Sequence, residues 1–144
     1  MGTSPETLVT EFHSKYDLSV DLTNSEILEK GELILRENLI REEYKEVQEA
    51  IAALRNAMYK GEKDSINELH SNVLKELCDL VYVAIGTAVS WDYDFTTAFD
   101  RVHDSNMSKD GGVNAGGKMT KGPSYIEADM SKCVRTVNDK YDLY

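Results

Sequence analysis

The segment KELCDLVYVAIG, residues 75–86, limits how this chain can fold, because it sets two carboxylates within an almost unbroken apolar run. A helix with this sequence is apolar on nearly every face, so we expect it to be buried. An unpaired ionised carboxylate in such a place costs several kcal/mol or more. The sequence therefore predicts that Glu76 and Asp79 have a partner or a bound metal ion.

A second acidic pair, Glu43 and Glu46, stands about thirty residues earlier, in REEYKEV. Each pair has i,i+3 spacing, which places both side chains on one face of a helix. Two such helices packed antiparallel would aim four carboxylates at one point, and a hard divalent cation, Mg2+ or Mn2+, would balance their charge. The alternatives are that the first pair belongs to an ordinary solvated helix face and that an arginine or a backbone cap satisfies the second.

Helical patterns dominate to about residue 108 and strand patterns are nearly absent, so we expect an all-α fold. The expected helices span residues 5–16, 25–60, 64–90 and 94–107, with Ser4, Ser25, Asp64 and Asp94 as N-caps. Gly31 marks a candidate kink or break, and Gly61 is the expected C-cap of the long second helix. Short connections favour antiparallel neighbours, as in a four-helix-bundle-like core. The third helix is apolar on more faces than one chain covers, which predicts a homo-oligomer.

We expect one domain over residues 1–144, with its core at about 5–108 and a loop and tail at 109–144. Five glycines fall between Gly111 and Gly122, which predicts a loop with a small hairpin around residues 114–117. The last twenty residues, from Tyr125, are expected to include one short helix.

Bulk properties exclude several classes of function. The net charge of −10 argues against sequence-independent nucleic-acid binding, which needs cationic side chains on the phosphates. The two cysteines, Cys78 and Cys133, have no metal-type spacing, so reduced thiols in the cytoplasm are the simplest interpretation. No apolar run reaches about 18 residues, and the first residues do not fit a signal peptide, so we expect neither a membrane span nor export.

Two other kinds of site fit less well. A di-iron carboxylate bundle needs Glu-x-x-His pairs, and none of His13, His70 and His103 follows a glutamate by three residues. Ligands that are all oxygen favour Mg2+ over redox iron. The glycine-rich segment lacks the P-loop pattern. Its lysines could still reach phosphates, although a solvated loop with ordinary charges is the alternative.

These residues also resemble a known family. REEYKEVQEAI followed by KELCDLVYVAIGTA resembles the Glu-Glu-x-x-Glu … Glu-x-x-Asp pattern of the MazG-like all-α nucleoside triphosphate pyrophosphohydrolases. The stretches FDRVHDSNMSKDGG and KMTKGPSYIEADM resemble those of its small phosphoribosyl-ATP pyrophosphohydrolase-like members, and LVTEFHSKYDL is similar to their first helix. The resemblance covers about residues 8–130. In one departure, Glu127-Ala128-Asp129 stands where the family usually has Pro-Pro-Asp, which bears only on the conformation of the tail.

The resemblance implies a homodimer or homotetramer that binds its substrate between helices near the subunit interface. It implies a catalytic set in which Glu42 is a supporting acid and four residues are the Mg2+ ligands: Glu43, Glu46, Glu76 and Asp79. It also implies a set of substrate-binding residues, with Phe12 and His13 near the base or sugar, Asn106 and Lys109 on the nucleotide, and Lys121 and Tyr125 closing the site.

The resemblance implies a reaction, and the chemistry of these residues is coherent with it. A triphosphate carries about four negative charges, so an acidic site can accept it only through a metal ion. Two Mg2+ ions could activate a water and steady the leaving pyrophosphate. We expect hydrolysis of (deoxy)nucleoside triphosphates to the monophosphate and pyrophosphate, with dGTP or dATP favoured by analogy alone. The alternatives are phosphoribosyl-ATP or a noncanonical nucleotide as substrate, or a nucleotide-binding helical dimer without turnover.

Overall fold

The computed structural model describes residues 3–135 of the chain, and its regular secondary structure is helical. Five helices are present in this part of the chain: α1 (Pro5–Lys15), α2 (Asn24–Glu29), α3 (Glu32–Lys60), α4 (Lys63–Ser90) and α5 (Phe95–Met107). No strand occurs among the described residues, where an isolated antiparallel bridge joins Val113 and Met119. The prediction of an all-α fold is therefore confirmed. None of the described helices is long and apolar enough to cross a membrane.

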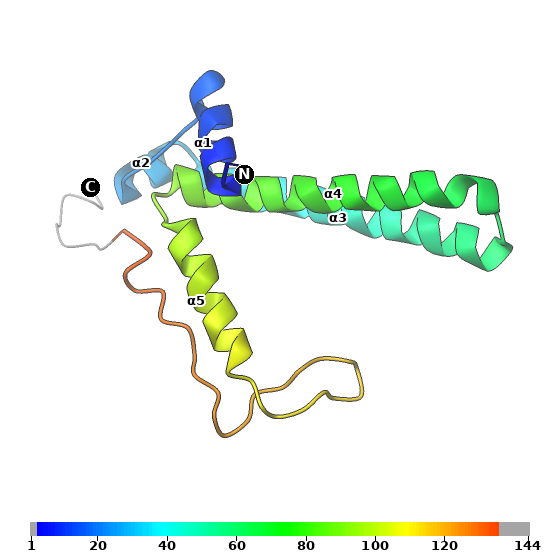
Figure 1. The fold of residues 1–144 in the computed structure, drawn as a ribbon. Helices are drawn as coiled ribbons and strands as arrows, with labels where there is room; N and C mark the ends of the chain where they lie inside the picture. The colour runs from blue at the N-terminus through cyan, green and yellow to red at the C-terminus, as the bar shows by residue number, and fades with distance from the viewer. Residues whose placement is uncertain (1–2, 136–144) are drawn as a thin grey trace.

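Helices α3 and α4 form a long antiparallel hairpin that dominates the shape of the molecule (Figure 1). Gly61 ends α3 with φ at 69°, a left-handed conformation that glycine adopts without a Cβ clash. The N–H of Glu62 then donates to the carbonyl oxygen of Ala57 at 3.0 Å, which closes the turn into α4. The expected C-cap and the expected antiparallel pairing of these two helices are both present.

The long second helix predicted from the sequence is two helices in the structure. Gly31, with φ at 64°, separates α2 from α3, so the candidate break is a real one. The N-cap of α2 is Thr23 and not Ser25, because Thr23 and Glu26 form a reciprocal capping box. Asp64 was also wrong as an N-cap, since α4 begins at Lys63 and Asp64 lies in its first turn.

The other two predicted caps are confirmed. Ser4 Oγ accepts from the N–H of Thr7 at 3.3 Å at the start of α1. Asp94 Oδ1 accepts from the N–H of Thr97 at 3.1 Å at the start of α5. Both caps act within one turn, which is why the local sequence is sufficient to predict them.

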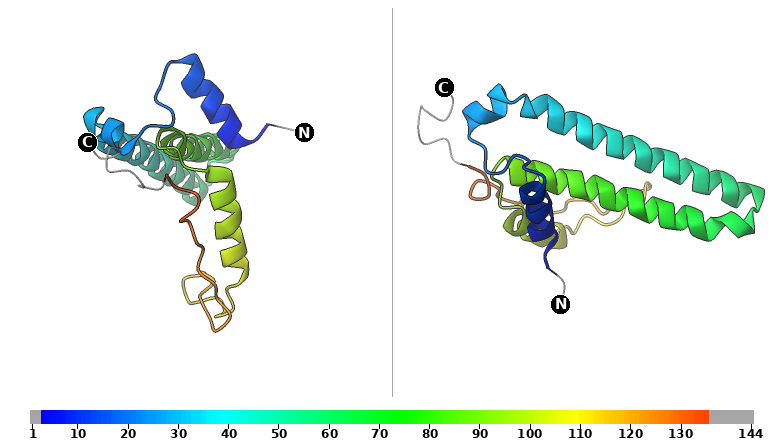
Figure 2. Two further views of the ribbon diagram at one scale, coloured as in Figure 1. Left: turned by 90° about the vertical axis from the view of Figure 1, so that its left-hand side faces the viewer. Right: turned by 90° about the horizontal axis from the view of Figure 1, so that it is seen from above.

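Helix α1 lies across α4 near the base of the hairpin, where Val9 packs with Ile85 and Val89 in a small buried cluster. Phe95, the first residue of α5, packs against the same cluster. Beyond this point α5 runs away from the hairpin (Figures 1 and 2). The expected antiparallel arrangement therefore holds for α3 and α4 and does not extend to α5.

A buried polar network ties the base of the hairpin to the loop after α1. Arg36 donates to Glu32 Oε2 at 3.2 Å and to Ser90 Oγ at 2.6 Å. Ser90 Oγ in turn donates to the carbonyl oxygen of Ser19 at 3.0 Å, and His13 Nδ1 donates to the same oxygen at 2.8 Å. Glu32, Arg36, His13 and Ser90 are all buried. The network thus joins α1, the loop at 17–22, α3 and α4.

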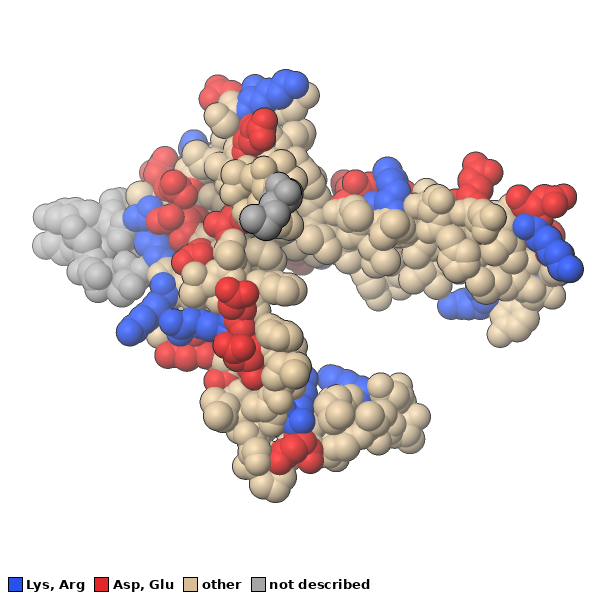
Figure 3. Space-filling model, in the orientation of Figure 1, with Lys and Arg blue, Asp and Glu red and all other residues tan. Residues whose placement is uncertain are grey.

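Much of the apolar surface of α4 is exposed in a single chain. Leu77 and Val81 keep 42% and 52% of their surface exposed, and Phe99 on α5 keeps 61%. Charged side chains gather where the N-terminal loop, the start of α5 and the tail meet, while wide areas of the hairpin are uncharged (Figure 3). The expected burial of this helix is therefore not achieved within one chain.

After α5 the chain turns back and runs along that helix as a strap, residues 118–130. Ser105 Oγ donates to the carbonyl oxygen of Ile126 at 2.6 Å, and Arg101 donates to that of Asp129 at 2.9 Å. At the far end, the N–H of Gly117 donates to the carbonyl oxygen of Asn114 at 3.0 Å, which forms the expected small hairpin turn. The short helix expected after residue 125 is absent up to residue 135, and residues 136–144 lie outside the described part.

Candidate functional site

The structure brings the two acidic pairs together on facing sides of α3 and α4. Glu43, Glu46, Glu76 and Asp79 each offer a carboxylate oxygen, and these oxygens all lie within 4.8 Å of one another. The i,i+3 spacing aligns each pair on its own helix, and the antiparallel hairpin then sets the pairs face to face. Glu76 is buried, Glu43 and Asp79 are half-buried, and Glu46 is exposed. We call these four side chains the carboxylate cluster.

The pKa of Glu43 reflects the crowding of acids in the carboxylate cluster. Burial raises the pKa of the Glu43 carboxyl above its ordinary value, and the hydrogen bond and charge of Glu46 raise it further. The charges of Asp79 and Glu76 act in the same direction. The three neighbouring acids therefore oppose ionisation of the Glu43 carboxyl.

The donor set fits a hard divalent cation. Glu43 Oε2 and Glu76 Oε2 are both buried and have no hydrogen-bond partner. A buried carboxylate oxygen in this state is costly unless a cation satisfies it. All ligand atoms offered are carboxylate oxygens, which Mg2+ and Mn2+ prefer over the softer nitrogen and sulfur donors.

A lysine that the sequence analysis did not single out lies against the carboxylate cluster. Lys75 Nζ is 2.9 Å from Asp79 Oδ2 and 3.4 Å from Glu76 Oε1. Its hydrogen bond to Asp79, together with the negative charge of Asp79, raises the pKa of the Lys75 ammonium. The i,i+4 spacing of Lys75 and Asp79 on one helix was the signal that could have identified this pair.

Aromatic side chains lie one helical turn from the carboxylate cluster. Tyr82 follows Asp79 by three residues, and its ring meets that of Phe12 with centroids 5.4 Å apart. The Phe12 ring also contacts that of Tyr16 at 4.9 Å. His13, by contrast, is 2% exposed, and its Nδ1 donates within the buried network.

The other residues predicted from the resemblance are more dispersed. Glu42 is exposed and precedes Glu43 on α3. Asn106 lies near the end of α5 and Lys109 just beyond it, while Lys121 stands on the strap with its ammonium 4.8 Å from the centroid of the Tyr125 ring. In the same chain, α5 runs away from the hairpin that carries the carboxylate cluster (Figure 1).

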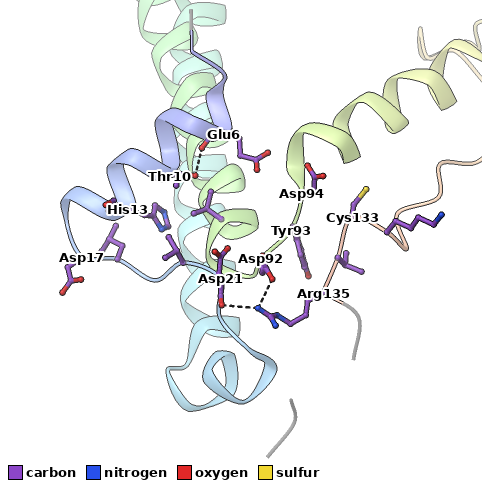
Figure 4. A pocket seen from close by; sticks show the side chains of 16 residues that line it. Glu6, Thr10, His13, Asp17, Asp21, Asp92, Tyr93, Asp94, Cys133 and Arg135 are labelled. Atoms are coloured by element: carbon purple, nitrogen blue, oxygen red, sulfur yellow. Dashed lines mark hydrogen bonds and ion pairs between the residues drawn. The ribbon is translucent and has the colours of Figure 1, made fainter. Parts of the chain in front are cut away.

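A hollow of about 640 Å³ lies elsewhere, between α1, the loop at 17–22, the connection from α4 to α5 and the tail. Arg135 points between Asp21 and Asp92 in this hollow (Figure 4), and its guanidinium is 2.8 Å from Asp92 Oδ2. Burial raises the pKa of Asp21, and the charge of Asp92 raises it further. None of the four cluster carboxylates lines this hollow, and Arg135 already neutralises part of its acidity, so we do not place the chemistry there.

Comparison with known families agrees with this geometry. The model of the phosphoribosyl-ATP pyrophosphohydrolase family matches residues 9–106, about two thirds of the chain, and the match includes all four cluster carboxylates. A search of curated proteins finds no matching relative. A family match of this extent, together with the confirmed all-α fold, agrees with the resemblance that the sequence motifs carry. The chain therefore belongs to the phosphoribosyl-ATP pyrophosphohydrolase family, within the MazG-like all-α nucleoside triphosphate pyrophosphohydrolases, and its general activity is nucleotide pyrophosphate hydrolysis.

Proposed function

We propose that this protein is a Mg2+-dependent hydrolase that converts (deoxy)nucleoside triphosphates to the monophosphate and pyrophosphate. The observation that carries the proposal is the approach of four carboxylates to within 4.8 Å, on two helices that lie inside the family match. Mn2+ has the same preference for oxygen donors and is the expected substitute.

The residues have separate roles in metal binding and in orienting the attacking water. Glu43, Glu46, Glu76 and Asp79 hold the divalent cation. When bound, this cation supplies Lewis-acid polarisation of the phosphoryl oxygens and lowers the pKa of a nearby water. Glu42 orients the attacking water as a supporting acid.

The bond changes are simple. The water oxygen forms a bond to phosphorus, and its proton passes to the surrounding solvent. The bridging oxygen between the α and β phosphates takes the electron pair of the bond that breaks. Water is the nucleophile, so no covalent intermediate with the protein is needed.

The phosphate-binding side chains come from a second copy of the chain in this proposal. Asn106 lies on α5, Lys109 follows that helix and Lys121 lies on the strap, and α5 leads away from the hairpin that holds the carboxylate cluster (Figure 2). Leu77 and Val81 on α4 are half-exposed, and a second copy would cover them. A homodimer or homotetramer would then bring cationic side chains to the phosphates of a nucleotide bound at the partner's acids.

The aromatic side chains beside the carboxylate cluster suit a nucleobase. Phe12 is 40% exposed, and its ring packs against the rings of Tyr16 and Tyr82. An aromatic face can stack on any base, so it fits the purine nucleotides dGTP and dATP without selecting them. His13, next to Phe12 on α1, fixes this helix to the following loop through its hydrogen bond to the carbonyl oxygen of Ser19.

Phosphoribosyl-ATP is the second candidate substrate, because the matching family model carries that name. It has the same α–β anhydride, so the same carboxylates would serve it, as they would a noncanonical nucleotide. A nucleotide-binding helical dimer without turnover remains the alternative outside enzymes. We place the protein in the cytoplasm because Cys78 is an exposed free thiol.

The first test is turnover of a panel of ribonucleoside and deoxynucleoside triphosphates and phosphoribosyl-ATP with Mg2+, with products separated by ion-exchange chromatography. We expect monophosphate and pyrophosphate from at least one triphosphate and loss of turnover in EDTA. Release of diphosphate and phosphate instead would contradict the proposed bond cleavage. Turnover of phosphoribosyl-ATP alone would select the second candidate.

The second test compares Asp79→Asn with Asp64→Asn, an exposed aspartate in the first turn of the same helix. Loss of a ligand should lower kcat/KM by about 100-fold or more, since a metal-ligand interaction provides several kcal/mol in the transition state. Asp64→Asn should stay close to the unmodified protein. Near-normal activity of Asp79→Asn would contradict the four-carboxylate site. Metal-dependent nucleotide binding by the unmodified protein without turnover of any substrate would favour the non-catalytic alternative.

A further inference from the structure

Lys75 is the side chain that forms ion pairs with the carboxylate cluster within residues 3–135. Its ammonium approaches two of the four acids, Asp79 at 2.9 Å and Glu76 at 3.4 Å. The other ion pairs found in this part of the chain involve acids outside the cluster. Among the residues that the structure describes, Lys75 therefore supplies the compensating positive charge in direct contact with the cluster.

The compensation from Lys75 is incomplete. Glu43 Oε2 and Glu76 Oε2 stay buried without a hydrogen-bond partner although the ammonium lies nearby. One ammonium carries a single positive charge, whereas the cluster holds four acids. The cluster thus keeps a strong demand for a cation of higher charge that can contact several oxygens at once.

The Lys75 ammonium can also move away from the carboxylate cluster into solvent at little cost in free energy. Its side chain is 64% exposed, on the open side of α4, and Asp79 is 38% exposed. Ion pairs this exposed add little free energy, because water solvates a released ammonium well. Lys75 contacts Asp79 Oδ2 and Glu76 Oε1, so a divalent cation bound by these two carboxylates would lie beside the ammonium and repel it. The two cations therefore compete for the same pair of acids.

We propose that Lys75 is a built-in counter-ion that occupies the carboxylate cluster in the metal-free protein and is displaced when a divalent cation binds. This inference rests on the proposed function, because it requires the cluster to bind metal. Lys75 thereby holds the acids together before metal arrives and weakens the apparent affinity of the site for metal. It acts through the metal ligands and is a positioning residue.

The competing explanation is an ordinary helix-surface ion pair with no bearing on metal. Lys45 and Glu49 on α3 are such a pair, 4.0 Å apart with both side chains well exposed, and Glu49 is not a cluster residue. Lys45→Gln removes the same charge as Lys75→Gln from the same helical hairpin. This variant is therefore a matched control for net charge.

The test is calorimetric titration of Mn2+ into the metal-free protein and its Lys75→Gln, Lys75→Arg and Lys45→Gln variants. We expect Lys75→Gln to bind Mn2+ about threefold to fivefold more tightly, the strength of an exposed ion pair. Lys75→Arg keeps the charge and should stay within about twofold of the unmodified protein, as should Lys45→Gln. Without metal, Lys75→Gln should melt below Lys45→Gln, because its cluster has lost its counter-ion.

The proposal predicts that Lys75→Gln binds Mn2+ more tightly and yet melts at a lower temperature without metal. A purely structural role predicts otherwise, because simple damage to the site would weaken metal binding. Equal or weaker Mn2+ binding by Lys75→Gln would overturn the proposal and leave the proposed function standing. If the unmodified protein and all variants give no Mn2+ binding and no melting shift, the metal site of the proposed function fails, and this inference fails with it.

Discussion

The ring of Phe12 on α1 meets the ring of Tyr82 on α4 edge to face, with centroids 5.4 Å apart and ring planes at 86°. This contact fixes α1 to α4 one helical turn from Asp79, which is a member of the carboxylate cluster. Phe12 nevertheless stays 40% exposed. In the proposed function the phosphates of the nucleotide lie at the four acids, and this open aromatic face receives the base.

Replacing Phe12 with alanine should therefore raise KM for the best substrate by about tenfold and change kcat much less, since stacking of a base on an aromatic ring contributes ~1–3 kcal/mol. Steady-state kinetics at saturating Mg2+ would measure both parameters. Tyr59→Ala is the control, because Tyr59 is 85% exposed at the far end of α3. An unchanged KM in Phe12→Ala would place the base elsewhere.

Removing the charge of Glu43 should stabilise the metal-free protein at neutral pH. The folded-state pKa of Glu43 is raised, chiefly by burial and then by Glu46. The folded protein therefore binds more protons than the unfolded chain between the two pKa values, and the free energy of unfolding falls as pH rises through that window. The penalty is complete above the folded pKa and absent below the unfolded one.

Melting curves of Glu43→Gln in EDTA across pH would test this directly. We expect its midpoint to exceed that of the unmodified protein at pH 7 and the difference to shrink as the pH approaches the ordinary value for glutamate. Glu49→Gln, on the exposed side of the same helix, should show no such pattern. Addition of Mg2+ should reverse the order, because the metal stabilises only the protein that retains all its ligands. A difference that grows on acidification would contradict the raised pKa.

The local parts of this fold were predictable from the sequence. Ser4, Asp94 and Gly61 act on backbone groups within one turn, so their residue types and positions suffice. Thr23, and not Ser25, is the cap because Thr23 has Glu26 three residues later, a capping-box pattern that is visible in the sequence. The direction of α5 was not predictable from connection length, since it depends on packing around Phe95 and on contacts with the strap.

The candidate site also combines features that the local sequence predicts with features that depend on distant contacts. The approach of the two acidic pairs follows from i,i+3 spacing and one antiparallel turn, both of which the sequence contains. The buried position of His13 does not follow from local spacing. Its partner Ser19 lies in a loop that also accepts a hydrogen bond from Ser90, 71 residues away in the sequence. A histidine beside a phenylalanine on a helix gives no local sign of which face will be covered.

The glycine-rich segment should control substrate binding through the shape of its backbone. A Cβ at Gly111 would collide with the carbonyl oxygen of Lys121, and the N–H of Gly111 donates to Thr120 at 3.0 Å. Gly111→Ala should therefore displace the strap that carries Lys121 and raise KM by about tenfold, the effect of losing one charge-assisted hydrogen bond of ~1.5 kcal/mol. Steady-state kinetics and a melting curve together would measure the effect.

The matched control for this change is Gly116→Ala in the same segment. A Cβ at Gly116 would stand 3.4 Å from Asn114 Oδ1, an ordinary contact, so this variant should behave as the unmodified protein. The melting midpoint should stay nearly constant in both variants, because the strap is hydrogen-bonded to α5, through Ser105 and Arg101, outside the long hairpin. Equal KM values for the two alanine variants would show that the strap does not reach the substrate.

Arg36 should be the residue whose loss most damages stability at the base of the hairpin. It neutralises Glu32, which is 2% exposed, and donates to the fully buried Ser90 at 2.6 Å. Arg36→Met leaves the Glu32 carboxylate buried and unpaired, which should lower the free energy of unfolding by about 3–5 kcal/mol. Chemical denaturation would measure this loss. Arg41→Met, which breaks an exposed pair with Glu37 on the same helix, should cost less than about 1 kcal/mol.

The double variant Glu32→Leu with Arg36→Met separates the cost of an orphaned charge from the contribution of the pair. A buried ion pair replaced by apolar side chains of similar volume is often neutral in stability, so the double variant should recover most of the loss seen in Arg36→Met. Recovery would show that the penalty comes from the isolated Glu32 carboxylate. If the double variant is as unstable as the single one, then Arg36 stabilises the fold mainly through Ser90 and the loop after α1, and the hydrogen bonds to that loop become the dominant contribution.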